Sequence, residues 1–300
     1  MALLGWLKDN KKDNKKDKKE VALVLSTGGA RGLAHIGAID QLNEMGYHIH
    51  SVAGTSIGAL IGGMYAAGRL EDFKRWMETV DRRKVLSLMD FSLSINHLMK
   101  GDRIIKAMME VIPDVKIEDL PIHYCAVATD AITGTEVDFT SGSLYEAIRA
   151  SISLPVFFDP VREKDRILLD GGLVNPLPLN RVKRKKNDLL VAVNVSGHDY
   201  KGQVELNKII KEQNEKSRVR SFINKMLPDD MDLNYYTLVN RSTSIMINCN
   251  VQQALKITPP DILVNIPMNR YNTFDFDKYA RLSAIGRNKT KTSINKFLGE

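Results

Sequence analysis

The pentapeptide Gly54-Thr55-Ser56-Ile57-Gly58 constrains the fold of this chain more than any other stretch. A short β-prone run, residues 51–53, precedes it, and a helix-prone run of small and apolar residues, 59–67, follows it. This order predicts a strand, a tight turn and a helix, which is the context of a nucleophile elbow. The turn would force Ser56 into a strained backbone conformation, so its neighbours Gly54 and Gly58 must be nearly without side chains. Ser56 would then lie at a helix N-terminus, where free N–H groups favour a developing alkoxide.

A second strand–turn–helix unit comes directly before the first. Residues 21–26 form a continuous apolar run that ends in a glycine turn, which predicts a buried strand. Residues 31–45 have apolar side chains near helical spacing, and residues 49–53 form the strand that enters the elbow. Two such units in succession favour an α/β fold, with a predominantly parallel sheet covered by helices.

The rest of the chain extends this pattern. We expect further strands at 121–129, 135–139, 166–169, 189–195 and 262–266, and helices over much of 70–120 and at 144–153. Asp102 is the predicted N-cap of a helix that runs to residue 111. Residues 91–99 are apolar but aperiodic, and belong either to the core or to a flexible cap over a lipid site. The predicted parts are a flexible basic tail at 1–20, a main domain at 21–200, and a mainly helical extension at 201–300 packed on it.

Composition and charge narrow the choice of partners and compartment. The net charge of +7 favours an acidic partner surface, either lipid headgroups or nucleic acid. The sequence has no zinc-finger spacing, RNA-binding aromatic signature or helix-turn-helix pattern, so we expect no nucleic-acid partner. We expect a cytoplasmic protein that does not span the membrane, because it has two cysteines, no signal peptide and no apolar run of about 20 residues.

Two basic segments are candidates for contact with anions. In residues 1–20 an apolar start with Trp6 precedes a run rich in lysine, which is typical either of a solvated tail or of a tether to anionic lipid. Such a tether would hold the protein at the inner face of the membrane. The second segment, Arg181 and residues 183–186, is either a solvated surface or a phosphate-contacting patch.

A glycine-rich segment, residues 26–32, follows the first strand and opens the first helix. Backbone N–H groups in this position suit an anion. A dinucleotide pyrophosphate would require G-x-G-x-x-G, but Thr27 occupies the first glycine position and no ribose-binding acid ends the next strand. Beside a nucleophile elbow, hydrogen-bond donors for the oxyanion of an acyl-transfer intermediate are the better interpretation.

A serine nucleophile also needs a proton acceptor, which is most often a histidine. Of the six histidines, only His198, in the loop after the strand at 189–195, resembles the late histidine of α/β-hydrolases, and it has no obvious acidic partner. Asp170 ends an apolar strand and precedes Gly171 and Gly172, so it belongs either to the functional edge of the sheet or to a plain turn. With Ser56 at another strand end, Asp170 is the better base if burial raises its pKa.

Together with residues 149–161, Arg-Ala-Ser-Ile-Ser-Leu-Pro-Val-Phe-Phe-Asp-Pro-Val, these segments resemble the patatin-like phospholipase family. The resemblance covers the chain from Val21 to about Val195, with the family's motifs in their usual order. It implies a three-layer α/β/α sandwich with a mostly parallel central sheet, related to cytosolic phospholipase A2. It also implies that residues 21–200 are a catalytic domain. The expected activity is hydrolysis of acyl esters of phospholipids or other lipids by a Ser-Asp dyad, with no catalytic histidine, no metal and no organic cofactor.

Carried onto this sequence, the resemblance implies a role for each motif residue. Ser56 would be the nucleophile and Asp170 the proton acceptor, and the N–H groups of Gly28, Gly29 and Ala30 would form the oxyanion hole. The supporting residues would be Arg31, Gly54, Gly58, Gly171 and Gly172. Thr27 departs from the family, which has glycine at this position. A positive φ at Thr27 would cost about 1–3 kcal/mol and distort the oxyanion hole. We favour a negative φ, with which Gly28 and Gly29 suffice to form the hole.

Two alternatives stay open beside a phospholipase A or lysophospholipase type of esterase. The chain could be a catalytically weak lipid-binding protein that is recruited to anionic membranes, which the substitution at Thr27 favours. It could also be a histidine-dependent esterase that uses His198.

Overall fold

The computed structural model describes residues 19–88, 101–155, 157–197, 235–267, 271 and 275–300. The described strands form one eight-stranded mixed sheet, in the order β5-β6-β3-β2-β1-β7-β8, with β4 paired to β3 off this path. The strands are β1 (Glu20–Leu25), β2 (His48–Thr55), β3 (His123–Asp130), β4 (Glu136–Phe139), β5 (Val161–Arg162), β6 (Ile167–Asp170), β7 (Leu189–Asn194) and β8 (Ile262–Asn265).

The central part of the sheet is parallel. Strands β3, β2, β1, β7 and β8 run in the same direction, and β4 and β6 join β3 in antiparallel pairing. The parallel strands β1 and β7 are continuous apolar runs, as expected for strands that helices cover on both faces. The predicted α/β fold with a mostly parallel sheet is confirmed.

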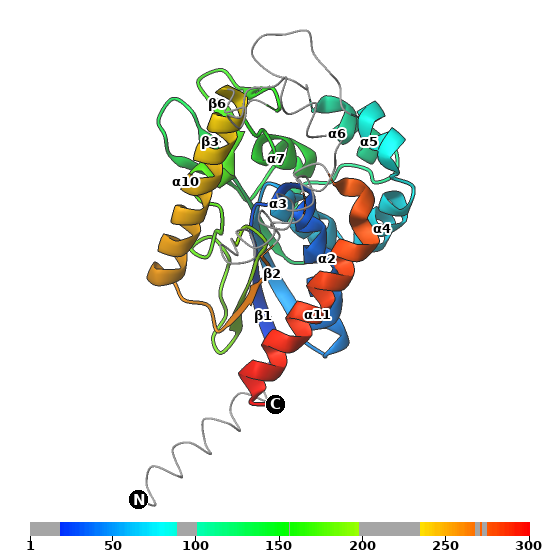
Figure 1. Ribbon diagram of the computed structural model, residues 1–300, viewed down its shortest axis with the longest axis vertical. Helices are drawn as coiled ribbons and strands as arrows, with labels where there is room; N and C mark the ends of the chain where they lie inside the picture. Colours follow the sequence, from blue (N-terminus) through cyan, green and yellow to red (C-terminus); the bar gives the residue numbers. More distant parts are fainter. Residues whose placement is uncertain (1–18, 89–100, 156, 198–234, 268–270, 272–274) are drawn as a thin grey trace, which may run out of the picture.

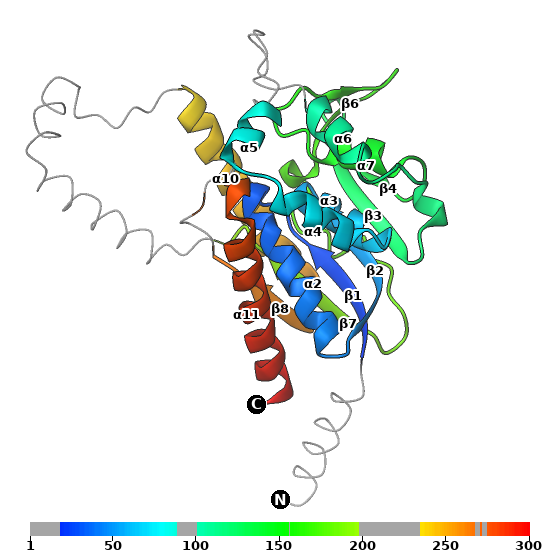
Figure 2. The ribbon, with the colours of Figure 1, turned by 90° about the vertical axis from the view of Figure 1, so that its right-hand side faces the viewer.

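Helices form a layer on each face of this sheet. Figure 1 shows α10 on the opposite side of the sheet from α2 and α11, and Figure 2 shows the second pair from the front. The helices are α2 (Ala34–Glu44), α3 (Ile57–Ala66), α4 (Leu70–Glu78), α5 (Arg82–Leu88), α6 (Asp102–Met109), α7 (Leu144–Ser151), α10 (Tyr235–Ile257) and α11 (Tyr279–Leu298), with short 3-10 turns η1 (Gly29–Leu33), η2 (Ile117–Asp119), η3 (Gly171–Leu173) and η4 (Phe276–Lys278). No helix within these ranges is long and apolar enough to cross a lipid bilayer.

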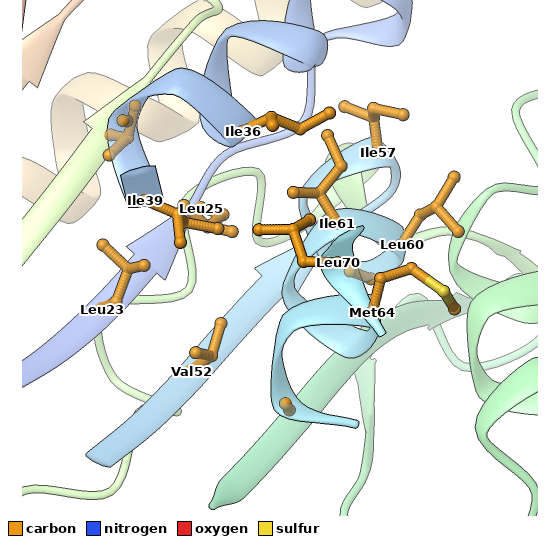
Figure 3. Packing of buried hydrophobic residues seen from close by; sticks show 14 of the residues in the cluster. Leu23, Leu25, Ile36, Ile39, Val52, Ile57, Leu60, Ile61, Met64 and Leu70 are labelled. Atoms are coloured by element: carbon orange, nitrogen blue, oxygen red, sulfur yellow. The ribbon is translucent and has the colours of Figure 1, made fainter. Parts of the chain in front are cut away.

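The core follows from the alternation of side chains along the strands. Leu23 and Leu25 of β1 pack against apolar side chains of α2 and α3, such as Ile36 and Ile61 (Figure 3). Residues 22 and 24 of the same strand point to the other face and pack with Val251 of α10. One short strand therefore contributes to both halves of the core, as its two-residue period requires.

The C-terminal segment contributes to the same sheet and the same core. Strand β8 pairs with β7 in parallel, which confirms the predicted strand at 262–266. Helix α11 crosses α2 so closely that a Cβ atom on Gly286 would lie 1.9 Å from the carbonyl oxygen of Ala34. The domain boundary at residue 200 stays a prediction. Of the tail predicted at 1–20, residues 1–18 lie outside the described residues, as do the apolar residues 91–99, and Glu20 begins β1.

Helix α6 begins one residue earlier than predicted. Gly101, with φ 79°, is the N-cap, and Asp102 is the first residue of the helix. The Asp102 carboxylate accepts a hydrogen bond from Nε of Arg149 at 3.0 Å. The prediction that the helix starts near Asp102 is therefore correct, but the N-cap is Gly101, whose left-handed φ favours glycine.

Candidate active site

The turn between β2 and α3 has the geometry expected of a nucleophile elbow. Ser56 joins the two elements with φ 59° and ψ −124°, a conformation that is strained for a residue with a side chain. A Cβ atom on Gly54 would lie 2.3 Å from the carbonyl oxygen of Gly58. A Cβ atom on Gly58 would lie 2.3 Å from the carbonyl oxygen of Leu25. The predicted strand, turn and helix are confirmed, since β2 ends at Thr55 and α3 begins at Ile57. No larger residue fits at either glycine.

A buried hydroxyl holds this strained turn. The Ser56 N–H donates to Oγ of Ser151 at 2.8 Å, and the Ser151 hydroxyl donates to the carbonyl oxygen of Val127 at 2.6 Å. Ser151 is fully buried at the end of α7, so it links the elbow to strand β3. The sequence alone assigns no individual role to Ser151, and its place in the motif at 149–161 is the one local signal for it.

Asp170 ends β6 and is held on all sides by hydrogen bonds. Its Oδ1 accepts the N–H of Gly172 at 2.7 Å, and its backbone N–H donates to the carbonyl oxygen of Ser153 at 2.9 Å. Its carbonyl oxygen accepts from the Thr129 hydroxyl at 2.9 Å. A Cβ atom on Gly171 would lie 2.2 Å from the carbonyl oxygen of Val127, so the chain needs glycine directly after the aspartate.

The fold brings the Asp170 carboxylate to the Ser56 hydroxyl. Burial raises the pKa of Asp170 to about 6, against smaller opposing effects of hydrogen bonds from the Ser56 side chain and the Gly172 N–H. Asp170 is 1% exposed, which explains why burial dominates. At neutral pH this carboxyl group is ionised but more basic than an ordinary aspartate, which suits it to accept a proton.

The glycine-rich segment lies beside this pair. Gly28 and Gly29 line the same cavity as Ser56 and Asp170. Within the described part of the chain, the N–H groups of Gly28 and Gly29 donate to no acceptor. Gly29 has φ 57°, and a Cβ atom on Gly28 would lie 2.4 Å from Cγ2 of Val195, so both positions require glycine. Two glycines whose N–H groups have no acceptor among the described residues therefore line the cavity.

The next two residues, Ala30 and Arg31, are placed differently from the two glycines. Ala30 is fully buried and is not among the described residues that line the cavity. Arg31 donates from Nε to the carbonyl oxygen of Gly28 at 2.9 Å, which fixes the orientation of the peptide between Gly28 and Gly29. Arg31 therefore supports the loop by a contact with its backbone.

Thr27 does not distort the loop. Among the described residues, only Ser56 and Asn187 combine a side chain with a positive φ, so Thr27 has the favoured negative φ. Its N–H donates to the carbonyl oxygen of Pro176 at 2.9 Å, and its own carbonyl oxygen accepts from the Ser196 hydroxyl. The Thr27 backbone is thus held in place, and its N–H is not available to an oxyanion.

The cavity that these groups share has polar residues at one end and an apolar wall. Its volume is about 160 Å³. Helix α4 contributes Phe73, Trp76 and Met77 to the wall, and α6 contributes Met108. Ile247 of α10 lines it as well. Such a wall suits an acyl chain whose ester group lies at Ser56.

None of the four described histidines lines this cavity. His35 is fully buried and contacts the carbonyl oxygen of Ser26 through Nε2 at 2.9 Å, and burial lowers its pKa to about 4. His48 and His50 lie in the first part of β2, where His48 pairs with Glu20 and His50 pairs with Asp188. His97 and His198 lie outside the described residues, so a role for His198 stays a prediction. The described residues contain no group of three or more acidic, histidine or cysteine side chains that could hold a metal ion.

Comparison with known proteins agrees with this geometry. The family model of patatin-like phospholipases matches residues 23–182. An uncharacterised NTE family protein of Mycobacterium tuberculosis is 44% identical over 179 residues, which are 60% of this chain and 50% of the relative. Lysophospholipase nte1 of Neurospora crassa is 31% identical over 279 residues, which are 89% of this chain and 18% of the relative. This chain thus spans half or less of the length of these relatives.

Among solved structures, VipD from Legionella pneumophila aligns with 94% of this chain and 67% of its own, at 15% identity and a TM-score of 0.46. The family assignment does not depend on that alignment. It depends on the family model, which covers more than half of the chain and includes the elbow, the glycine-rich loop and Asp170. The chain belongs to the patatin-like phospholipase family.

Proposed function

We propose that this protein is a serine lipid acyl hydrolase of the phospholipase A or lysophospholipase type. The observation that supports this most is the meeting of Ser56, the buried carboxylate of Asp170 and two unpaired backbone donors at one end of an apolar cavity. The relatives include proteins named lysophospholipases, which agrees with an ester of a lipid as substrate.

In the first half of the reaction, Asp170 accepts the proton of the Ser56 hydroxyl while Oγ attacks the ester carbonyl carbon. The carbonyl oxygen becomes an oxyanion, and the N–H groups of Gly28 and Gly29 stabilise its charge. The C–O bond of the ester then breaks, and the leaving alcohol takes the proton from Asp170. The product of this half is an acyl group on Ser56.

In the second half, water takes the place of the alcohol. Asp170 accepts a proton from this water, whose oxygen attacks the acyl carbon beside the same two donors. The bond to Oγ breaks, Ser56 recovers its proton from Asp170, and a fatty acid leaves. The raised pKa of Asp170 serves both halves, because the group must accept a proton and return it.

The rival function, a catalytically weak lipid-binding protein, relied on Thr27. The backbone of Thr27 has no positive φ, and both glycines that follow it face the cavity. The feature that favoured weak activity therefore gives it no support, and we retain hydrolysis as the proposal.

We propose further that the protein is cytoplasmic and peripheral, with residues 1–20 as a tether to anionic lipid at the inner face of the membrane. This segment combines apolar residues with many lysines, the two components of surface binding. Deletion of residues 2–18 should weaken binding to anionic vesicles and leave hydrolysis of a short-chain soluble ester unchanged. Equal vesicle binding by the intact and the truncated protein would show that residues 2–18 are not a membrane tether.

A lipid panel with product analysis tests the enzymatic proposal. The wild type should release fatty acid from at least one phospholipid or lysophospholipid, and Ser56→Ala and Asp170→Asn should each lose this activity. The exposed residues Ser141 and Asp165 provide matched controls, since Ser141→Ala and Asp165→Asn remove the same groups away from the cavity. His198→Ala distinguishes the histidine-dependent alternative, which predicts loss of hydrolysis in that variant and its survival in Asp170→Asn.

A further inference from the structure

A second cavity lies at the opposite end of the sheet from Ser56. Its volume is about 560 Å³, and it lies at the N-terminal ends of β2 and β3. His48 begins β2 and Ser56 follows its last residue, so the two cavities are roughly 25 Å apart at about 3.3 Å per residue. A cavity of this size is within the range of small-molecule sites, about 300–1,000 Å³.

Basic side chains dominate the polar lining of this cavity. Three histidines and three lysine or arginine residues line it: His48, His50, His123, Arg181, Lys183 and Lys185. Glu118 is the one acidic residue among the described lining residues, and its carboxylate already accepts the N–H of Gly142 at 2.8 Å. The remaining lining is largely apolar, with side chains such as Val52 and Leu120.

The basic loop at residues 181–188 is held in place by buried contacts. The Ser51 hydroxyl donates to the carbonyl oxygen of Lys183 at 2.6 Å. The buried carboxylate of Asp188 accepts from Nε of Arg184 and from the N–H of Lys185, both at 2.7 Å. Nε2 of His50 contacts the same carboxylate at 2.9 Å. The loop that presents Lys183 is therefore built into the fold.

A β-bulge contributes to this arrangement. Val21 pairs with Ile49 and Ala22 pairs with Ser51, so His50 is an extra residue in β2. Bulges redirect a side chain and are frequent beside functional sites. Here the bulge brings His50 to Asp188 and to the wall of the cavity.

Among the described lining residues, Lys183 is the basic side chain of the 181–188 loop that no acidic residue pairs with. Arg181 pairs with Glu136 and lies 3.7 Å from Asp138, and Lys185 lies 3.7 Å from Glu20. Lys183 has no acidic partner within 4 Å in the described part of the chain. Partial burial, followed by the charges of Lys183, His50 and Lys185, lowers the pKa of His123. The charges of Lys183 and Lys185 thus act on His123, and the same charges would stabilise an anion placed between Lys183 and His123.

We infer that this cavity is a binding site for an organic phosphate, whose charged group lies between Lys183 and His123 and whose organic part contacts the apolar wall. The phosphate can belong to a soluble phosphomonoester or to a lipid headgroup, which share this chemistry. The site is separate from the proposed reaction at Ser56 and does not depend on it.

The test uses the 300-residue protein at low ionic strength and follows the ring resonances of its histidines by NMR. Glycerol 3-phosphate and inorganic phosphate should each shift the His123 resonances in a saturable manner, and glycerol 3-phosphate should bind more tightly because it also contacts the apolar wall. Lys183→Gln should weaken binding roughly tenfold, since it removes a charge-assisted hydrogen bond. The matched control is Lys186→Gln, which removes an exposed lysine of the same cluster that does not line the cavity and should change affinity less than about twofold.

Vesicles of phosphatidic acid and of phosphatidylcholine distinguish the two sources of phosphate. Loss of phosphatidic acid binding in Lys183→Gln but not in Lys186→Gln would identify a lipid headgroup as the ligand. Shifts with glycerol 3-phosphate, together with vesicle binding that Lys183→Gln leaves unchanged, would identify a soluble ligand. The inference is overturned if no probe shifts His123, or if both lysine variants weaken binding equally, because the attraction would then be unspecific.

Discussion

The buried carboxylate of Asp170 should destabilise the folded protein at neutral pH. Its pKa is about 6 in the folded protein and near 3.8 when the chain is unfolded. Because the folded-state pKa is above the unfolded value, the protonated Asp170 side chain contributes fully to stability below about pH 3.8. This contribution is lost as the pH rises through 6, because the buried group must then ionise. The difference between a pKa of 3.8 and one of about 6 corresponds to about 3 kcal/mol of stability, since each tenfold change in an ionisation constant is worth about 1.36 kcal/mol.

Asp170→Asn removes this charge and keeps the shape of the side chain. The Asn oxygen can still accept the N–H of Gly172, so we expect a variant that folds and has no hydrolytic activity. The stability of Asp170→Asn relative to wild type should increase by about 2 kcal/mol between pH 4 and pH 7.5, less than the full difference of about 3 kcal/mol because the unfolded chain is already partly ionised at pH 4. Burial lowers the pKa of His35, so its protonation destabilises the folded protein at low pH. This effect is the same in both proteins and cancels in the stability difference.

Urea denaturation of both proteins over this pH range measures the difference. The exposed Asp165→Asn variant is the control, and its stability relative to wild type should vary by less than about 0.5 kcal/mol with pH. If the Asp170→Asn difference is constant with pH, or grows toward acid, then Asp170 is not the buried high-pKa group described here and the proposed base is lost.

Three further predictions concern other parts of the molecule. The kcat/KM of the wild type should rise with pH through about 6 and level off above 7, because Asp170 must be ionised; a profile that is flat from pH 5 to 8 would contradict this. Ser151→Ala leaves the N–H of Ser56 buried without its acceptor, so kcat should fall at least tenfold with little change in KM, and an unchanged kcat would show that the elbow does not need this bond. Gly286→Ala should lower the free energy of unfolding by about 1–3 kcal/mol in urea, because the new methyl group meets the backbone of α2, whereas the exposed Thr292→Ala should cost under about 0.5 kcal/mol.

Much of the fold could be predicted because the local signals were strong and agreed with one another. The apolar runs that became β1 and β7 are buried on both faces, so their sequences identify them without tertiary information. The glycines at 54 and 58 were predictable for a similar reason, since their role follows from close contacts within one turn and the neighbouring strand. The motif order also identified Ser56 and Asp170 as candidates that meet at one cavity.

Features that depend on distant contacts could not be predicted. The role of Ser151 arises from its position between the elbow and β3, which no local pattern specifies. The close crossing of α2 and α11 joins Gly286 to Ala34, far away in the sequence. The second cavity likewise needs the start of β2, the start of β3 and the loop at 181–188 to come together. The basic cluster was visible in the sequence, but the bulge at His50 and the buried Asp188 that organise it were not.

Ser56 is proposed to be the nucleophile, with the oxyanion of the tetrahedral intermediate held by the backbone donors of Gly28 and Gly29. A crystal structure of the protein after reaction with a fluorophosphonate tests this proposal most directly. We predict phosphorus bonded to Oγ of Ser56, with the phosphoryl oxygen about 2.7–3.1 Å from the backbone nitrogens of Gly28 and Gly29. An adduct on another residue, or a phosphoryl oxygen that points away from both glycines, would contradict the account.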